Sequence, residues 1–252
     1  MDMGIKGKVA LVTGGSRSIG RATSLLLGAE GARVAVNYVK NKGAADEVVK
    51  MIADGGSAAV AVRGDVSVKA DVERVIAETE KALGPINILV NNAGIAAGGW
   101  SLDKLEEEGW DKVMDVDLKS VWLVSQPVAA KMAARGGGAI VNVASFMGYP
   151  MANTAAYGTA KAGVIHLTKT MAMELAKKNV RVNSVSPGNI ATDMTAHMFG
   201  TEEKREKMKE RIPLGRIAVP EDVADLIVFL AGDRAKHVTG VDVNISGGQL
   251  IY

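Results

Sequence analysis

The sequence predicts an α/β protein built on a doubly wound parallel sheet with helices on both faces. Short β-rich runs alternate with helical stretches along the whole chain, several runs are apolar enough to be buried, and a glycine-rich turn joins the first run to a helix. Ligands of such sheets bind beyond the carboxyl ends of the strands. The expected strands are VALV (9–12), RVAVNY (33–38), AAVAVRGD (58–65), INILV (86–90), AIVNVAS (139–145), RVNSVSPG (181–188) and VDVNI (241–245).

The first of these units, residues 8–31, is predicted to form a buried strand, a glycine turn and an amphipathic helix. Gly14 permits the tight turn, and Gly20 lets the helix and the strand approach closely. The free amides at the start of the helix would face a pyrophosphate, with the helix dipole behind them. This is the context of a Rossmann-type dinucleotide-binding site.

A helix predicted over residues 155–178 carries Tyr157 and Lys161, four residues apart and therefore on one face. A phenol ionises near pH ~10, so it needs help to act as an acid or base at neutral pH. The Lys161 ammonium would lower the pKa of Tyr157 and make it a proton donor to a carbonyl group. Taken alone, this spacing fits an aromatic core residue beside a solvated lysine equally well. The neighbouring Ser145 ends the strand that precedes this helix.

The chain resembles the short-chain dehydrogenase/reductase family through five motifs that follow one another in the family's order. They are TGGSRSIG (13–20), NNAG (91–94), Ser145, Tyr157-x-x-x-Lys161 and PGNIAT (187–192). Within the family, the chain is similar to 3-oxoacyl-carrier-protein reductases and related ketoreductases. The resemblance implies hydride transfer between a nicotinamide and a carbonyl group or secondary alcohol, with Tyr157 protonating the oxygen and Ser145 donating a hydrogen bond to it.

The resemblance also implies which residues form the site. The catalytic set would be Ser145, Tyr157, Lys161 and Asp117. The cofactor-binding set would be Gly14, Ser16, Arg17, Ser18, Ile19, Gly20, Asn37, Tyr38, Asp65, Val66, Asn92, Ala93, Gly94, Tyr157, Lys161, Pro187, Gly188, Ile190 and Thr192. Within this set the resemblance implies that Asp65 and Val66 contact the adenine and that Ile190 and Thr192 hold the nicotinamide carboxamide. For Asp65 the competing interpretation is a turn or helix-capping acid.

NADP(H) is the expected cofactor, and NAD(H) is the less favoured one. Asn37 and Tyr38 end the second strand, where NAD-binding relatives usually offer a carboxylate to the adenosine ribose. Without that carboxylate, Arg17, Lys40 and Lys42 would suit a 2′-phosphate. The alternative interpretation is that Lys40 and Lys42 are ordinary surface cations.

Two positions depart from the family pattern. Ser18 stands where the middle glycine of the turn is expected, so either the loop shifts outward or the hydroxyl makes its own contact with the cofactor. Asp117 stands where the family has a relay asparagine. A carboxylate there would pair with Lys161 if near enough and oppose formation of the tyrosinate.

The segment of about 189–216 is expected to form a substrate lid, with Met194, Met198 and Phe199 as an apolar wall or as plain packing. An acidic carrier-protein substrate would favour basic residues beside the cleft, and Arg135 is a candidate. Met173 stands where carrier-protein reductases commonly have arginine, so a small ketone, sugar or steroid substrate stays open.

Length and composition add the remaining expectations: one domain over residues 1–252, without repeats or a membrane span. The net charge of +2 gives no basic stripe for nucleic acid, and the three scattered histidines and the absence of cysteine imply no metal site. We expect a cytoplasmic protein, because the N-terminal apolar run is too short for a signal peptide.

The helical stretches SVWLVSQPVAAKMAARG and AGVIHLTKTMAMELAKK carry more apolar residues than one buried face needs. The family resemblance implies a homotetramer, although burial on two sides within one subunit would explain the same pattern. The alternative from another functional class is a nucleotide-binding regulator with weakened catalysis, suggested by Ser18 and Asp117.

Overall fold

The computed structural model describes residues 2–95, 101–149, 155–193, 195 and 199–250. Seven parallel strands form one sheet in the order β3-β2-β1-β4-β5-β6-β7, which confirms the predicted fold class. Each strand falls on one of the runs expected from the sequence. The strands are β1 (Val9–Val12), β2 (Arg33–Tyr38), β3 (Ala59–Arg63), β4 (Ile86–Asn91), β5 (Gly138–Val143), β6 (Val180–Pro187) and β7 (Asp242–Ile245).

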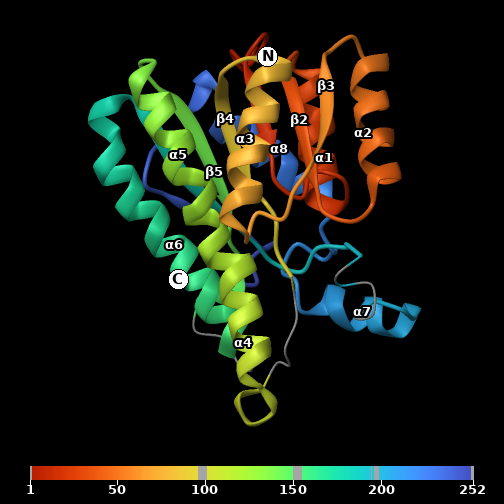
Figure 1. Ribbon diagram of the computed structural model, residues 1–252. Coiled ribbons are helices and arrows are strands. Elements are labelled where there is room, and N and C mark those ends of the chain that lie inside the picture. Colours follow the sequence, from red (N-terminus) through yellow and green to blue (C-terminus); the bar gives the residue numbers. More distant parts are fainter. Residues whose placement is uncertain (1, 96–100, 150–154, 194, 196–198, 251–252) are drawn as a thin grey trace.

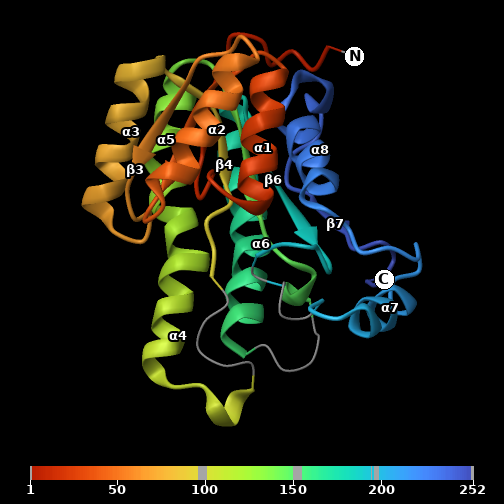
Figure 2. The ribbon, with the colours of Figure 1, turned by 90° about the vertical axis from the view of Figure 1, so that its right-hand side faces the viewer.

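Helices cover both faces of the sheet, as Figures 1 and 2 show. One face carries α1 (Ser18–Ala29), α2 (Lys42–Asp54) and α8 (Pro220–Ala231), and the other carries α3 (Lys69–Leu83), α5 (Ser120–Ala134) and α6 (Ala155–Leu175). Two further helices, α4 (Glu107–Met114) and α7 (Glu202–Glu210), lie at the end of the molecule opposite the N-terminus. Short 3-10 turns cover Leu102–Lys104, Phe146–Gly148, Ala176–Lys178 and Asp233–Ala235, and a π-helical turn covers Asp115–Lys119.

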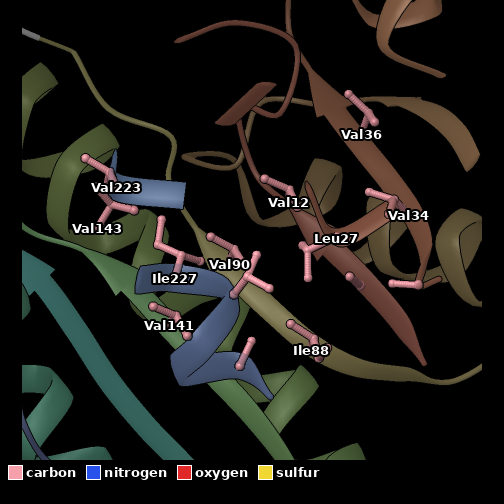
Figure 3. Close-up of a cluster of buried hydrophobic side chains, with 14 of the residues drawn as sticks. Val12, Leu27, Val34, Val36, Ile88, Val90, Val141, Val143, Val223 and Ile227 are labelled. Carbon is pink, nitrogen blue, oxygen red and sulfur yellow. The ribbon is translucent and has the colours of Figure 1, made fainter. Parts of the chain in front are cut away.

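The sheet forms because its strands are apolar on both faces. Figure 3 shows one of the two main clusters, in which Leu27 of α1 and Ile227 of α8 pack on valines and isoleucines of the strands. Both side chains are fully buried, and burial of such a side chain stabilises the fold by roughly 1.5–3 kcal/mol. A second cluster joins α3, α5 and α6 to the opposite face. None of the described helices combines the length and the apolar composition that crossing a membrane requires.

The order of the strands reverses at β1, which pairs with β2 on one side and with β4 on the other. Chains leaving β1 and β4 therefore turn to opposite sides of the sheet and leave a crevice beyond the carboxyl ends of these strands. At this crevice the first turn of α1 approaches the turn after β1 so closely that the residue at the contact must be small. A Cβ atom on Gly20 would lie 2.3 Å from the carbonyl oxygen of Gly14 and 2.5 Å from Nδ2 of Asn92. The predicted close approach at Gly20 is thus a real requirement of the fold.

We expect Gly20→Ala to lower the free energy of unfolding by about 1–3 kcal/mol, because the new methyl group must displace backbone atoms. Denaturant unfolding measures the change. The matched control is Gly43→Ala in the first turn of α2, where a Cβ atom would meet only Oδ1 of Asn41, at 3.6 Å. That control should keep or raise the stability, by up to about 1 kcal/mol. Equal losses in the two variants would contradict the steric argument.

Candidate active site

Ser145, Tyr157 and Lys161 come together between the end of β5 and the first turns of α6. Ser145 follows β5 and caps the short turn Phe146–Gly148, where its Oγ accepts a hydrogen bond of 3.2 Å from the amide of Met147. Tyr157 and Lys161 lie one helical turn apart on α6. Nζ of Lys161 lies 5.5 Å from the centre of the Tyr157 ring. The three side chains that the sequence proposed as catalytic therefore share one place in the structure.

The amine of Lys161 is buried and held from two sides. Nζ donates to the carbonyl oxygen of Val143 at 3.0 Å, and it lies 3.2 Å from Oδ1 of Asp117. Only 4% of the lysine side chain and none of the aspartate side chain is exposed. At such low exposure an ion pair is screened little, so each charge strongly affects the other.

Asp117 belongs to the π-helical turn Asp115–Lys119, which connects α4 to α5. Such turns occur often at functional sites, where the extra residue redirects a side chain. Oδ2 of Asp117 accepts a hydrogen bond of 3.0 Å from the amide of Ile95. A Cβ atom on Gly94 would lie only 2.7 Å from Oδ1 of Asp117. The glycine that closes the NNAG motif thus leaves room for the carboxylate.

The pKa of Tyr157 is shifted in the direction opposite to the one expected. Burial of the phenol raises its pKa, and the Asp117 carboxylate raises it further. The Lys161 ammonium and a hydrogen bond with Ser145 act in the lowering direction but do not prevail. The expected lowering rested on the Lys161 charge alone. Burial of the Tyr157 phenol disfavours its charged form and outweighs the effect of the lysine.

Lys161 remains the charged partner in this cluster. Burial acts to lower the pKa of its amine, but Asp117 and Tyr157 together raise it above the usual value. Burial also raises the pKa of Asp117, against the opposing effect of the Lys161 charge. The structure thus places one buried cation between a carboxylate and a phenol.

The glycine turn after β1 is suited to a phosphate group. Gly14 has φ of +61°, the left-handed conformation that a tight turn requires. Helix α1 begins directly after Arg17, its first turn contains no acidic residue, and no side chain caps its amides. Its N-terminus therefore presents N–H groups and a favourable helix dipole at the β1/β4 crevice. Ser16, Ile19 and Gly20 lie in the same turn and helix start.

Ser18 adopts the conformation of the glycine that it replaces. Its φ is +47°, and a non-glycine residue in this region costs roughly 1–2 kcal/mol. Its Oγ lies 3.5 Å from Oδ2 of Asp193, which follows the PGNIAT segment. This contact lies within the protein, and a contact of the hydroxyl with the cofactor stays a prediction.

Asn37 was expected beside the adenosine ribose, but its side chain points into the protein. Oδ1 accepts from the amide of Gly14 at 3.2 Å, and Nδ2 donates to the carbonyl oxygens of Val62 and Gly64. Its side chain is therefore a support for the glycine turn. Tyr38 is also largely buried, with 7% exposure.

Asp65 acts as the turn acid of the competing interpretation. Its Oδ1 accepts from both the amide and the hydroxyl of Ser67, ahead of α3. Val66 is buried in the core cluster beneath α3. The contacts of Asp65 and Val66 with an adenine remain predictions.

Thr13 is a supporting residue that the sequence analysis missed. Its hydroxyl accepts from the amides of Asn92 and Ala93 at 2.9 and 3.0 Å, and Nδ2 of Asn92 donates to the carbonyl oxygens of Thr13 and Gly14. These bonds join the turn after β1 to the end of β4. The available signal was the threonine that opens the TGG segment.

The PGNIAT segment continues from β6 at Pro187 along the same edge of the sheet. Ile190 is buried and forms a parallel bridge with Ala218, and Oγ1 of Thr192 lies 3.0 Å from Oγ1 of Thr195. The contacts of Pro187, Gly188, Ile190 and Thr192 with a cofactor remain predictions. Phe199 is 95% buried, which favours packing, whereas Met194 and Met198 lie outside the described residues.

Two of the expected basic residues have other partners. Lys42 lies 2.6 Å from Asp46, one turn along α2. Arg135 donates to the carbonyl oxygen of Ile86 at 2.9 Å and pairs with Glu80, at the edge of the sheet where β4 begins. The expectation that Arg135 lies beside the cleft is wrong, because the candidate site occupies the opposite edge. Within the described ranges there is no group of three side chains arranged to hold a metal ion.

A family model described as enoyl-(acyl carrier protein) reductase matches residues 14–249. Curated 3-oxoacyl-[acyl-carrier-protein] reductases are 42% identical in Staphylococcus epidermidis, over 96% of this chain and 98% of the relative, and 43% identical in Synechocystis, over 97% and 98%. The chain belongs to the short-chain dehydrogenase/reductase family. It is an oxidoreductase that acts on carbonyl and alcohol groups.

The structure of this short-chain dehydrogenase/reductase is also similar to solved structures. A candidate gluconate dehydrogenase from Agrobacterium tumefaciens superimposes with a TM-score of 0.94 at 32% identity, over 100% of this chain and 99% of the other. The shared fold therefore extends to both the glycine turn and the segment of α6 that carries Tyr157.

We expect Asp117→Asn to maintain or raise turnover near neutral pH. Asp117 helps to raise the pKa of Tyr157, so its neutral replacement should lower that pKa. Alcohol oxidation requires the phenolate, and its rate should therefore rise at a lower pH in the variant than in the wild type. The measurement is the pH profile of kcat/KM for alcohol oxidation.

The matched control is Asp115→Asn in the same π-helical turn. Asp115 is half exposed and pairs with Lys119 at 2.8 Å, so its replacement should leave the profile in place. A large loss of activity in Asp117→Asn, or an unmoved profile, would refute the assigned role.

Proposed function

We propose that the chain is an NADP(H)-dependent reductase of a 3-oxoacyl thioester or a similar ketone. The observation that carries this proposal is the convergence of Ser145, Tyr157 and Lys161 beside the β1/β4 crevice. That crevice has the uncapped start of α1 on one side and the loop after β6 on the other. A phosphate-binding helix end and a proton donor at one site are the parts that carbonyl reduction requires.

In the proposed mechanism a bound nicotinamide supplies the hydride. Tyr157 donates its phenolic proton to the carbonyl oxygen, and the hydroxyl of Ser145 donates a hydrogen bond to the same oxygen. The Lys161 ammonium stabilises the resulting phenolate, because the cation lies 5.5 Å from the ring centre. In the reverse direction Tyr157 accepts the proton of an alcohol.

The raised pKa of Tyr157 favours the reductive direction of this proposal. Reduction starts from the protonated phenol, and a pKa above the ordinary value keeps the phenol protonated throughout the neutral range. Oxidation starts from the phenolate, which this environment disfavours. The same three residues, intact and in contact range, argue against a regulator that has lost catalysis.

NADP(H) is supported by the residues around the end of β2. The position where a ribose-binding carboxylate would discriminate against a 2′-phosphate is held by Asn37, whose side chain is turned inward. Arg17, in the glycine turn, and Lys40, after β2, are both exposed on this edge of the sheet. A phosphate carries almost two negative charges at neutral pH, so these cations suit it.

The proposed substrate follows from the relatives, which are named as reductases of 3-oxoacyl groups on a carrier protein. The alternative is a free alcohol or sugar acid, as the candidate gluconate dehydrogenase suggests. The charge of α7 is the observation that bears on this alternative. Four basic residues of α7 are matched by four acidic ones, with Lys207–Glu203 and Lys209–Glu206 each paired at 2.6 Å. The helix thus offers little net charge to an acidic carrier.

We further propose a homotetramer assembled through α5 and α6. Trp122 on α5 is 46% exposed, and Met173 on α6 is 82% exposed. Large apolar side chains on neighbouring helices are typical of surfaces that become buried in an oligomer. Residues 189–216 remain the proposed lid, and a cytoplasmic location remains a prediction from the sequence.

We expect Tyr157→Phe to lower kcat for ketone reduction by about 10²–10⁴-fold, the usual contribution of a positioned general acid. The assay follows NADPH absorbance with a panel of carbonyl compounds that includes 3-oxoacyl thioesters, sugar acids and steroids. NADPH affinity should change little, because only the phenolic hydroxyl is removed. Dinucleotide binding without turnover of any compound by the wild type would favour the regulator instead.

We expect Arg17→Ala to weaken NADPH binding by about tenfold or more and to leave NADH binding nearly unchanged. A charge-assisted hydrogen bond to phosphate contributes roughly 1.5–3 kcal/mol, and NADH lacks that phosphate. Calorimetric titration with the two cofactors measures the difference. Lys42→Ala is the control, because Lys42 is already paired with Asp46. An equal loss for both cofactors would assign Arg17 to another part of the nucleotide.

A further inference from the structure

The chain that follows β7 returns to the candidate cofactor site. Strands β6 and β7 run parallel and end side by side, with Pro187 aligned to Ile245. The amide of Gly188 donates to the carbonyl oxygen of Ile245 at 3.1 Å. Residues 246–250, here called the C-terminal tail, therefore leave the sheet beside the PGNIAT segment.

One side chain of the tail connects directly to that segment. Oε1 of Gln249 accepts two hydrogen bonds from Asn189, one from its amide at 3.3 Å and one from its Nδ2 at 3.0 Å. Both residues are half-buried. Asn189 immediately precedes Ile190, so this contact fixes the backbone where the PGNIAT segment turns towards the crevice.

The tail itself is held in one conformation. The amide of Gln249 donates to the carbonyl oxygen of Ser246 at 3.2 Å, and the amide of Leu250 donates to Oγ of Ser246 at 3.1 Å. Gly247 and Gly248 have φ of +63° and +91°, which only glycine adopts without strain. This compact turn carries Gln249 on a defined support.

The same turn contacts the end of the proposed lid. The amide of Leu214 donates to the carbonyl oxygen of Gly247 at 3.0 Å. A Cβ atom on Gly248 would lie 3.0 Å from the ring of Pro213. The tail therefore touches both the segment after β6 and the chain that returns from α7.

We propose that Gln249 is a positioning residue that fixes the loop 188–192 for the nicotinamide end of the cofactor. The proposal rests on the nicotinamide-dependent function proposed above. It assigns a role to a residue that lies 60 positions from its partner in the sequence. Loss of the Gln249 acceptor should release the loop and weaken binding of the nicotinamide without affecting the adenosine end.

The test compares two probes in calorimetric titrations of the whole chain. NADPH occupies both ends of the site, whereas 2′-phosphoadenosine diphosphate ribose lacks the nicotinamide. Gln249→Met keeps the length of the side chain and removes the acceptor. We expect NADPH binding to weaken by about fivefold or more and binding of the shorter probe to stay unchanged, since each of the two lost hydrogen bonds typically contributes a factor of about this size.

Gln249→Glu is the matched control, because a carboxylate oxygen can accept the same two hydrogen bonds. It should bind both probes within about threefold of the wild type. If the carboxylate did not accept these two hydrogen bonds, a charged group would be left without donors, and binding would weaken by more than this. Equal weakening for both probes in Gln249→Met, or no weakening for NADPH, would overturn the proposal. A loss in Gln249→Glu as large as in Gln249→Met would also overturn it.

If Gln249→Met does not fold, Asn189→Ala provides the second variant, since it removes the Nδ2 donor and keeps the backbone donor. It should weaken NADPH binding selectively, by about half the logarithmic loss expected for both bonds. Unselective or absent weakening would overturn the proposal. A wild-type protein that binds neither probe would instead overturn the proposed function, and this proposal with it.

Discussion

The close approach of β1 and β4 beyond their carboxyl ends is the constraint on which the candidate site depends. The hydroxyl of Thr13 accepts from two amides of the chain after β4, and Asn92 donates back to the turn after β1. Gly20 has no room for a side chain in the same space. These contacts let the start of α1 and the end of β4 face one crevice, and no rearrangement of surface loops could substitute for them.

A buried charge cluster gives that crevice its chemical bias. Asp117, which stands where the family resemblance leads us to expect an asparagine, places its carboxylate 3.2 Å from Nζ of Lys161. The Asp117 carboxylate stabilises the Lys161 ammonium. Its negative charge also offsets part of the effect of that ammonium on Tyr157, whose pKa is raised. A carboxylate at this position therefore shifts the protonation equilibrium of Tyr157 towards the protonated phenol, the form that the proposed reduction requires.

Apolar runs bounded by glycine and polar residues were enough to predict all seven strands, because strands buried on both faces leave a strong local signal. The site was predictable where a motif follows a strand end. The bonds of the Asn37 side chain to the glycine turn were not predicted, because a polar residue at a strand end can bind a ligand or the backbone and the sequence does not distinguish the two. The wrong placement of Arg135 beside the cleft could have been avoided from the sequence. A helix that follows a parallel strand runs back to the amino edge of the sheet, and Arg135 lies at the end of such a helix. The direction of the pKa shift of Tyr157 could not be predicted, because it depends on how deeply the phenol is buried, and that is known only from the fold.

The proposed catalytic residues and the proposed substrate lid lie on different elements of the fold. Tyr157, Lys161 and the glycine turn all lie at the ends of strands or in the first turns of helices, whose positions the core fixes. Among the described residues of the range 189–216, the amide of Leu214 donates to the carbonyl oxygen of Gly247 in the tail. Their helix α7 has no buried residue, so little packing restrains its sequence. If this segment is the proposed lid, its sequence can change, and with it the choice between a carrier-bound thioester and a free alcohol, without displacing Tyr157 or Lys161.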